Sequence, residues 1–301
     1  MTPGELRAAL RGVIAFAPTP FTEDDRLDLD GLARIVDDLV ASGGPVAVCG
    51  GVGEYPALDL DEYRAAMRVA VETAAGRVPV IAGIGHGVRI AAGLAADAAR
   101  AGIDGLMVDP FWFAEPSLDG LVAHHRALAD ASGLGLIVFS TKGQQYHLDQ
   151  LLRLAELDGV VALKEEAGDA ALFAAARERI GNRWAWINGM AELHVAKYAA
   201  IGADAFTSGL INVAPQLTRD VRDAAAAGRW DAVAELVERI RPFSALRAKA
   251  PGYSTAVIKE AMAMLGRPGG GRVRPPMARL ASADREHLRE LLPSLGVAAI
   301  A

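Results

Sequence analysis

Eight short apolar runs, each followed by an amphipathic stretch, place the strongest constraint on the fold of this chain. The amphipathic stretches have the spacing of helices, and several end in glycine, a common helix terminator. Strands that alternate with helices form parallel sheets. The runs are VIAFAPTP (13–20), PVAVCGG (45–51), VPVIAGIG (78–85), GLMVDP (105–110), GLIVFS (135–140), VVALKEE (160–166), WAWING (184–189) and AFTSGL (205–210).

Eight strand–helix units predict an α/β fold, the (β/α)8 TIM barrel. We expect the barrel to occupy residues 1–212, and residues 213–301 to form a C-terminal helical extension packed on it. A doubly wound open sheet is the alternative. That fold usually carries a GxGxxG turn after its first strand, whereas PTPFTEDD (18–25) follows the first expected strand here.

Composition excludes several classes of partner and site. The chain has 301 residues, 52% of them hydrophobic, and a net charge of −6. No basic cluster is present to follow phosphates, so we expect no nucleic-acid partner. Cys49 is the single cysteine, which leaves no disulfide framework and no metal-binding spacing. We find no signal peptide or membrane-spanning stretch in the sequence and therefore expect a cytoplasmic protein without a membrane partner.

Lys164 stands at the end of the apolar run 160–163, where a buried strand is expected. In a barrel of this kind, the carboxyl ends of the strands form the active-site face. The lysine has two interpretations from spacing alone. It is either a surface residue paired with Glu165 or Glu166, or a desolvated amine that acts as a nucleophile.

Several motifs resemble the dihydrodipicolinate synthase/N-acetylneuraminate lyase family of class I aldolases. They cover nearly the whole chain in the family's order, and they are most similar to its 5-dehydro-4-deoxyglucarate dehydratase branch. The resemblance implies a Schiff base on Lys164, no metal or organic cofactor, and a homo-oligomer, most often a tetramer. The motifs are GVIAFAPTPFTEDDRLDLDGL, CGGVGEYPALDLDEY, GRVPVIAGIGHG, GLIVFS, ALKEEAGD, PGYSTAVIKEAM and VRPPM.

A glycine-rich turn after the second run is the candidate site for the substrate carboxylate. Its backbone N–H groups are free to bind an anion, and glycine allows close approach. A tight turn without a ligand explains the same glycines. The full set of candidate substrate-binding residues is Gly50, Gly51, Val52, Gly53, Glu54, Gly189, Glu192, Thr207 and Ser208.

Three positions depart from the family pattern by losing a hydroxyl group. Phe139 stands where relatives place a proton-relay tyrosine, Val52 replaces a usual threonine, and Trp112 stands near another usual tyrosine. His86 is a weak candidate for a replacement relay, because its unperturbed pKa lies near neutrality. The run DPFWFAEP (109–116) predicts an exposed apolar patch and therefore a contact between subunits.

These observations predict a Schiff-base lyase that acts on a small-molecule 2-oxo acid, most like 5-dehydro-4-deoxyglucarate dehydratase. One alternative is an aldolase of the same family with a different, less polar substrate, in keeping with Phe139, Val52 and Trp112. Another is a catalytically impaired homologue that binds an oxo acid as a sensor or scaffold.

Overall fold

Eight parallel strands close into a barrel in the computed structural model, so the predicted (β/α)8 fold is confirmed. The structure describes residues 1–110 and 115–300. Each strand coincides with one of the eight apolar runs, although β1 begins one residue before its run. Each strand pairs with its sequence neighbours, and β1 pairs with β8 to close the ring. The strands are β1 (Gly12–Phe16), β2 (Val46–Val48), β3 (Val80–Ile84), β4 (Gly105–Val108), β5 (Gly135–Ser140), β6 (Val160–Glu165), β7 (Ala185–Asn188) and β8 (Ala205–Ser208).

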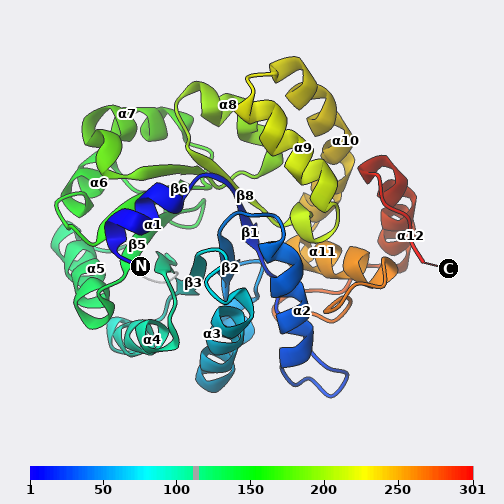
Figure 1. Cartoon of the computed structure of the whole chain (residues 1–301), viewed down its shortest axis with the longest axis horizontal. Helices are drawn as coiled ribbons and strands as arrows, with labels where there is room; N and C mark the ends of the chain where they lie inside the picture. The colour runs from blue at the N-terminus through cyan, green and yellow to red at the C-terminus, as the bar shows by residue number, and fades with distance from the viewer. Residues whose placement is uncertain (111–114, 301) are drawn as a thin grey trace.

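Helices surround the barrel on its outer side (Figure 1). Their buried faces and the outward side chains of the strands form the larger hydrophobic core. The helices are α1 (Pro3–Ala9), α2 (Leu29–Val40), α3 (Leu60–Ala74), α4 (Val88–Ala101), α5 (Leu118–Ser132), α6 (Leu148–Leu154), α7 (Ala170–Ile180), α8 (Val195–Ala200), α9 (Pro215–Ala226), α10 (Trp230–Ala248), α11 (Tyr253–Met264) and α12 (Ser282–Leu291).

A second, smaller core fills the barrel interior. Leu6 of the amino-terminal helix α1 and Leu10, directly after that helix, belong to this core, next to inward side chains of the strands such as Ile14. An added Cβ at Gly105 or Gly135 would lie 2.3 or 2.8 Å from Leu6 Cδ2, so a larger residue at either position would displace the Leu6 side chain. Because α1 closes the amino end of the barrel, a ligand can enter only from the carboxyl ends of the strands.

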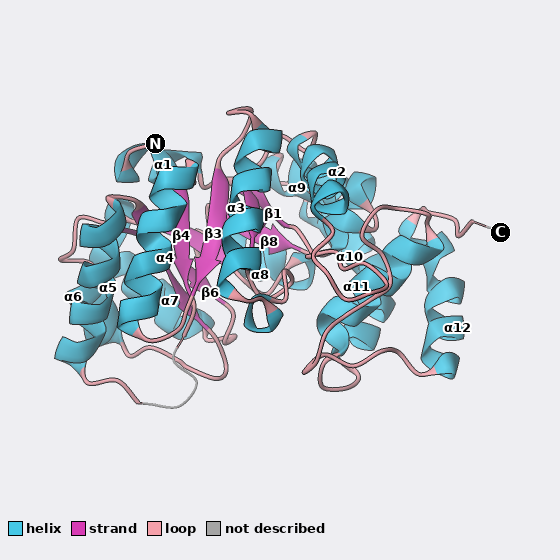
Figure 2. Ribbon diagram, turned by 90° about the horizontal axis from the view of Figure 1, so that it is seen from below, coloured by secondary structure: helices cyan, strands magenta, loops and turns pink. Residues whose placement is uncertain are grey.

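Helices α10, α11 and α12 pack against one another on one side of the barrel (Figures 1 and 2). The expected boundary at 212/213 falls between a short 3₁₀ turn, Leu210–Asn212, and α9. Helix α11 contacts that turn, which places the extension beside the end of β8. The extension is therefore close enough to supply side chains to the carboxyl face.

Two absences follow from the described part of the chain. It contains no helix with the length and apolar character needed to span a membrane. It also contains no group of three or more His, Cys, Asp or Glu side chains placed to hold a metal ion.

Candidate active site

Lys164 points into the barrel from the end of β6, and its side chain is only 6% exposed. Its Nζ lies 2.7 Å from Glu166 Oε2. The same nitrogen lies 3.5 Å from the ring centroid of Phe139 and 4.9 Å from that of Phe16. The amine therefore has an apolar wall on two sides and one carboxylate within hydrogen-bonding distance, which is a suitable setting for a nucleophile.

A cavity of about 340 Å³ opens over Lys164 at the carboxyl ends of the strands. This volume is in the range of small-molecule sites. Six of the residues singled out from the sequence line it: Gly51, Val52, Phe139, Lys164, Gly189 and Thr207. Four polar residues outside the expected set also line it: Glu166, Arg247, Ser254 and Thr255. Arg247, Ser254 and Thr255 come from the helical extension.

The turn after β2 has the backbone needed to hold an anion. A Cβ at Gly53 would lie 2.9 Å from the backbone nitrogen of Cys49, so packing favours glycine there. A Cβ at Gly50 would lie 3.1 Å from Met107 Cε and would require that side chain to shift. Among the described residues, the N–H groups of Gly51, Val52 and Gly53 donate to no protein acceptor. Gly51 and Val52 line the cavity, whereas Gly53 does not, so the N–H groups of Gly51 and Val52 are the ones available to a carboxylate there.

Glu54 does not reach the cavity, which corrects its place among the substrate-binding candidates. Its side chain is fully buried, with Oε1 2.7 Å from Lys259 Nζ and Oε2 accepting a hydrogen bond from Arg274 N at 2.9 Å. Lys259 also donates to Thr19 O at 2.8 Å, and Thr19 Oγ1 donates to Gly53 O at 2.6 Å. Glu54 therefore anchors the glycine turn to the extension.

Glu192 and Ser208 form a second buried pair outside the cavity lining. The Ser208 hydroxyl donates to the Glu192 carboxyl group, and both residues are 1% exposed. Burial raises the pKa of Glu192, and the hydrogen bond from Ser208 opposes that rise. In contrast, Thr207 and Gly189 line the cavity, and Thr207 Oγ1 donates to Gly189 O at 3.3 Å.

His86 is not brought to Lys164, because it lies on the exposed surface beyond β3. Its backbone N–H donates to Tyr55 Oη at 3.1 Å, and its ring contacts the edge of the Tyr55 ring. It does not line the cavity over Lys164. The structure therefore gives no support to His86 as the replacement relay. Trp112 and the rest of 111–114 lie outside the described residues.

Asp109, at the end of β4, is a buried carboxyl group that the sequence reasoning did not select as a site residue. Its Oδ2 has no hydrogen-bond partner among the described residues. Burial raises the pKa of Asp109 to about 8, with the charge of Lys164 lowering it and that of Glu166 raising it. The Asp109 carboxyl is therefore mostly protonated near neutral pH.

We expect Asp109→Asn to remove a pH dependence from the stability of the protein. The ordinary pKa of this group is 3.8, so between about pH 4 and pH 8 the folded state binds more protons than the unfolded state. The wild-type free energy of unfolding should thus fall relative to that of Asp109→Asn as pH rises, by at most about 1.4 kcal/mol per pH unit. Urea unfolding of both proteins across this range measures the difference, and parallel curves would contradict the prediction.

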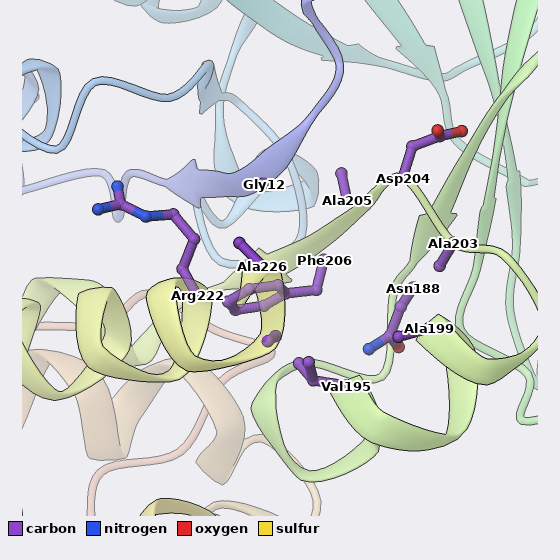
Figure 3. Close-up of a pocket in the computed structure, with 11 residues that line it drawn as sticks. Gly12, Asn188, Val195, Ala199, Ala203, Asp204, Ala205, Phe206, Arg222 and Ala226 are labelled. Carbon is purple, nitrogen blue, oxygen red and sulfur yellow. The ribbon is translucent and has the colours of Figure 1, made fainter. Parts of the chain in front are cut away.

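A different cavity, of about 200 Å³, lies between the barrel and helices α8 and α9 (Figure 3). Arg222 extends from α9 towards Gly12 at the start of β1, and its Nη1 donates to Ser42 O at 3.0 Å. Asp204 accepts a hydrogen bond from Trp186 N at 3.0 Å. Because its charged groups already have partners, this cavity is a packing gap and not the site of chemistry.

Comparison with known proteins agrees with this geometry. The model of the dihydrodipicolinate synthetase family matches residues 9–295. A probable 5-dehydro-4-deoxyglucarate dehydratase 2 of Streptomyces avermitilis is 37% identical, over 94% of this chain and 86% of that relative. A probable 5-dehydro-4-deoxyglucarate dehydratase of Azotobacter vinelandii is 32% identical, over 98% of this chain and 99% of that relative.

Solved structures give the same result for the fold. The crystal structure of dihydrodipicolinate synthase from Oceanobacillus iheyensis superposes with a TM-score of 0.91 and 30% identity, over 98% of this chain and 99% of that one. A family model that matches almost the whole chain, together with relatives of similar length, leaves one assignment. This chain belongs to the dihydrodipicolinate synthetase family and is a lyase.

Proposed function

We propose that the protein is a Schiff-base dehydratase that acts on 5-dehydro-4-deoxyglucarate. The observation that carries the proposal is the position of Lys164 Nζ, buried in the cavity at 2.7 Å from Glu166 Oε2. This substrate is the one named for two relatives that match nearly the whole chain.

The chemistry starts at the 2-oxo carbon of the substrate. Lys164 adds to the carbonyl and water is lost, which gives an iminium that withdraws electrons from the adjacent carbon. Removal of a proton from that carbon allows the C–O bond of the next carbon to break, and the hydroxyl leaves as water after it takes up a proton. The distal carboxylate then leaves as CO₂, and the electron pair that it leaves behind takes up a proton. Hydrolysis of the imine by water releases the product and restores the Lys164 amine.

Glu166 is the group best placed to move these protons. Its carboxylate lines the cavity and lies within hydrogen-bonding distance of the amine, whereas Phe139 has no exchangeable proton. The free N–H groups of the glycine turn hold the carboxylate next to the 2-oxo group. The site therefore has a nucleophile, a proton carrier and an anion-binding turn around one volume.

The direct test is to incubate the purified protein with 5-dehydro-4-deoxyglucarate and to follow substrate loss and CO₂ release. We expect turnover, and borohydride treatment during turnover should add the mass of a reduced adduct to the intact chain. Trapping without turnover would contradict the dehydratase assignment and favour a lyase with another substrate. No trapping and no turnover would favour the catalytically impaired homologue.

A second candidate, a lyase acting on a less polar 2-oxo acid, is supported by the apolar side chains of the cavity. Phe16, Val52 and Phe139 all line it. Apolar side chains next to the imine make favourable contacts with a hydrocarbon chain, but they provide no hydrogen-bond partner for the hydroxyl groups of a sugar acid.

Phe139→Tyr separates the two candidates. If the substrate is 5-dehydro-4-deoxyglucarate, the new hydroxyl adds a proton relay beside Lys164 and should raise kcat by about 10- to 100-fold. If the substrate is less polar, an unpaired hydroxyl should lower activity on that substrate. Steady-state kinetics of both proteins measure the change, and Phe139→Leu, which alters packing without a hydroxyl, should not raise kcat.

We further propose a cytoplasmic homotetramer, the assembly that the family resemblance implies. An oligomer is in keeping with the apolar run 109–116, of which residues 111–114 lie outside the described part. Sedimentation of a stable monomer at micromolar concentration would contradict it.

A further inference from the structure

Arg247, near the end of α10, places a guanidinium group in the cavity that contains Lys164. A Cβ at Gly209, just beyond β8, would lie 3.6 Å from Arg247 Nη2 and 3.4 Å from Val52 Cγ2. The guanidinium therefore lies over the end of β8 and near the side chain of Val52, at the boundary between barrel and extension.

Ser254, at the start of α11, fixes the orientation of this guanidinium. Arg247 Nε donates to Ser254 O at 3.1 Å, and Nη2 donates to Ser254 Oγ at 3.0 Å. Both acceptors are uncharged. The bonds orient the guanidinium without neutralising it, and Ser254 itself also lines the cavity.

Among the described residues, Arg247 forms no ion pair within 4.0 Å, and its Nη1 has no acceptor. Burial lowers the pKa of Arg247, while the more distant charges of Glu192 and Glu166 oppose that shift. Arg241, on the same helix, instead pairs with Glu238 on the surface. Arg247 is partly buried, and its charge has no ion-pair partner among the described residues. An anionic ligand in the cavity would supply that partner.

We infer that Arg247 binds a second carboxylate of the substrate, so that the site selects 2-oxo diacids over 2-oxo monoacids. The inference rests on the proposed imine at Lys164, which fixes the 2-oxo end of the ligand. The free N–H groups of Gly51 and Val52, which line the cavity, then take the carboxylate beside the imine. Arg247 is left for the distal carboxylate, to which a guanidinium donates two parallel hydrogen bonds. A diacid derived from glucarate carries this second carboxylate, whereas pyruvate does not.

The test compares 2-oxoadipate with 2-oxohexanoate, which have equal chain length and differ at the distal carboxylate. Borohydride trapping is measured by intact mass over a range of concentrations for wild type, Arg247→Met and Arg241→Met. In wild type we expect the diacid to half-saturate at about 10- to 100-fold lower concentration than the monoacid. Arg247→Met should abolish this preference, and it should change the half-saturating concentration of the monoacid by less than about threefold. Arg241→Met should behave as wild type.

Two outcomes would overturn the inference while leaving the imine chemistry intact. One is equal trapping of both acids by wild type. The other is an equal weakening of the trapping of both acids in Arg247→Met, which would indicate that the guanidinium binds the carboxylate beside the imine. Trapping of neither acid by wild type would overturn the proposed function itself.

Ser254→Ala provides a second variant in case Arg247→Met does not fold. It removes the hydroxyl that orients the guanidinium and keeps the charge. We expect a weakening of about threefold to tenfold for 2-oxoadipate only, the scale of one lost hydrogen bond. Unchanged trapping of 2-oxoadipate by Ser254→Ala would contradict the proposed orientation.

Discussion

Lys164→Ala will form no adduct with pyruvate or with a sugar-derived 2-oxo acid under borohydride, and its turnover will fall by about 10⁴-fold or more. The expected loss is large because the variant has no nucleophile and cannot form the covalent intermediate at all, whereas other substitutions remove a single contact to it. The Lys164 amine lies beside Glu166 and the ring of Phe139 and lines the cavity, whereas the other buried lysine among the described residues, Lys259, does not line it. Intact mass before and after trapping, and kcat on 5-dehydro-4-deoxyglucarate, measure the two effects.

Lys142→Ala is the matched control, because Lys142 is exposed on the loop after β5. It should trap and turn over as wild type does. Lys259 is the second buried lysine among the residues described, and its amine is already paired with Glu54. An adduct that persists in Lys164→Ala and maps to Lys259 would show that Lys259, and not Lys164, forms the imine.

The barrel was predictable from the sequence because strands buried on both faces require continuous apolar runs, and eight such runs fix the number of strands. Lys164 was predictable for the same reason, since a charge at the end of such a run must lie at the carboxyl face. Glu166 was within reach of the same reasoning, because side chains two residues apart point to one side of a strand. Lys164 and Glu166 accordingly meet in the barrel, whereas Glu165 accepts a hydrogen bond from Tyr198 outside it.

Arg247 had no comparable signal. It is one of several arginines along α10, and its helix spacing does not distinguish it from Arg239 or Arg241. Its place in the cavity depends on how the extension packs against the end of β8, which is a tertiary contact that local pattern does not encode. The same reason explains the error at Glu54, whose partner Lys259 comes from the extension.

The second large effect, on stability, is expected at the buried pair of Lys259 and Glu54. Lys259→Met should lower the free energy of unfolding by about 3–5 kcal/mol, because it leaves the carboxylate of Glu54 buried without its countercharge. Both side chains are fully buried, with Lys259 Nζ 2.7 Å from Glu54 Oε1. Urea unfolding of wild type and variant at the same pH measures the loss.

Glu54→Gln combined with Lys259→Met should recover a large part of that stability, since the double variant has no charge left unpaired. Arg241→Met, which breaks an exposed pair with Glu238, provides the control and should cost less than about 1 kcal/mol. A cost for Lys259→Met as small as this would show that the pair adds little to folding. Glu54 directly follows the turn whose backbone N–H groups are proposed to bind the substrate carboxylate, so the single variant Lys259→Met should weaken borohydride trapping of pyruvate. Weaker trapping by a protein that is still folded would show that the extension helps to hold the glycine turn in its binding conformation.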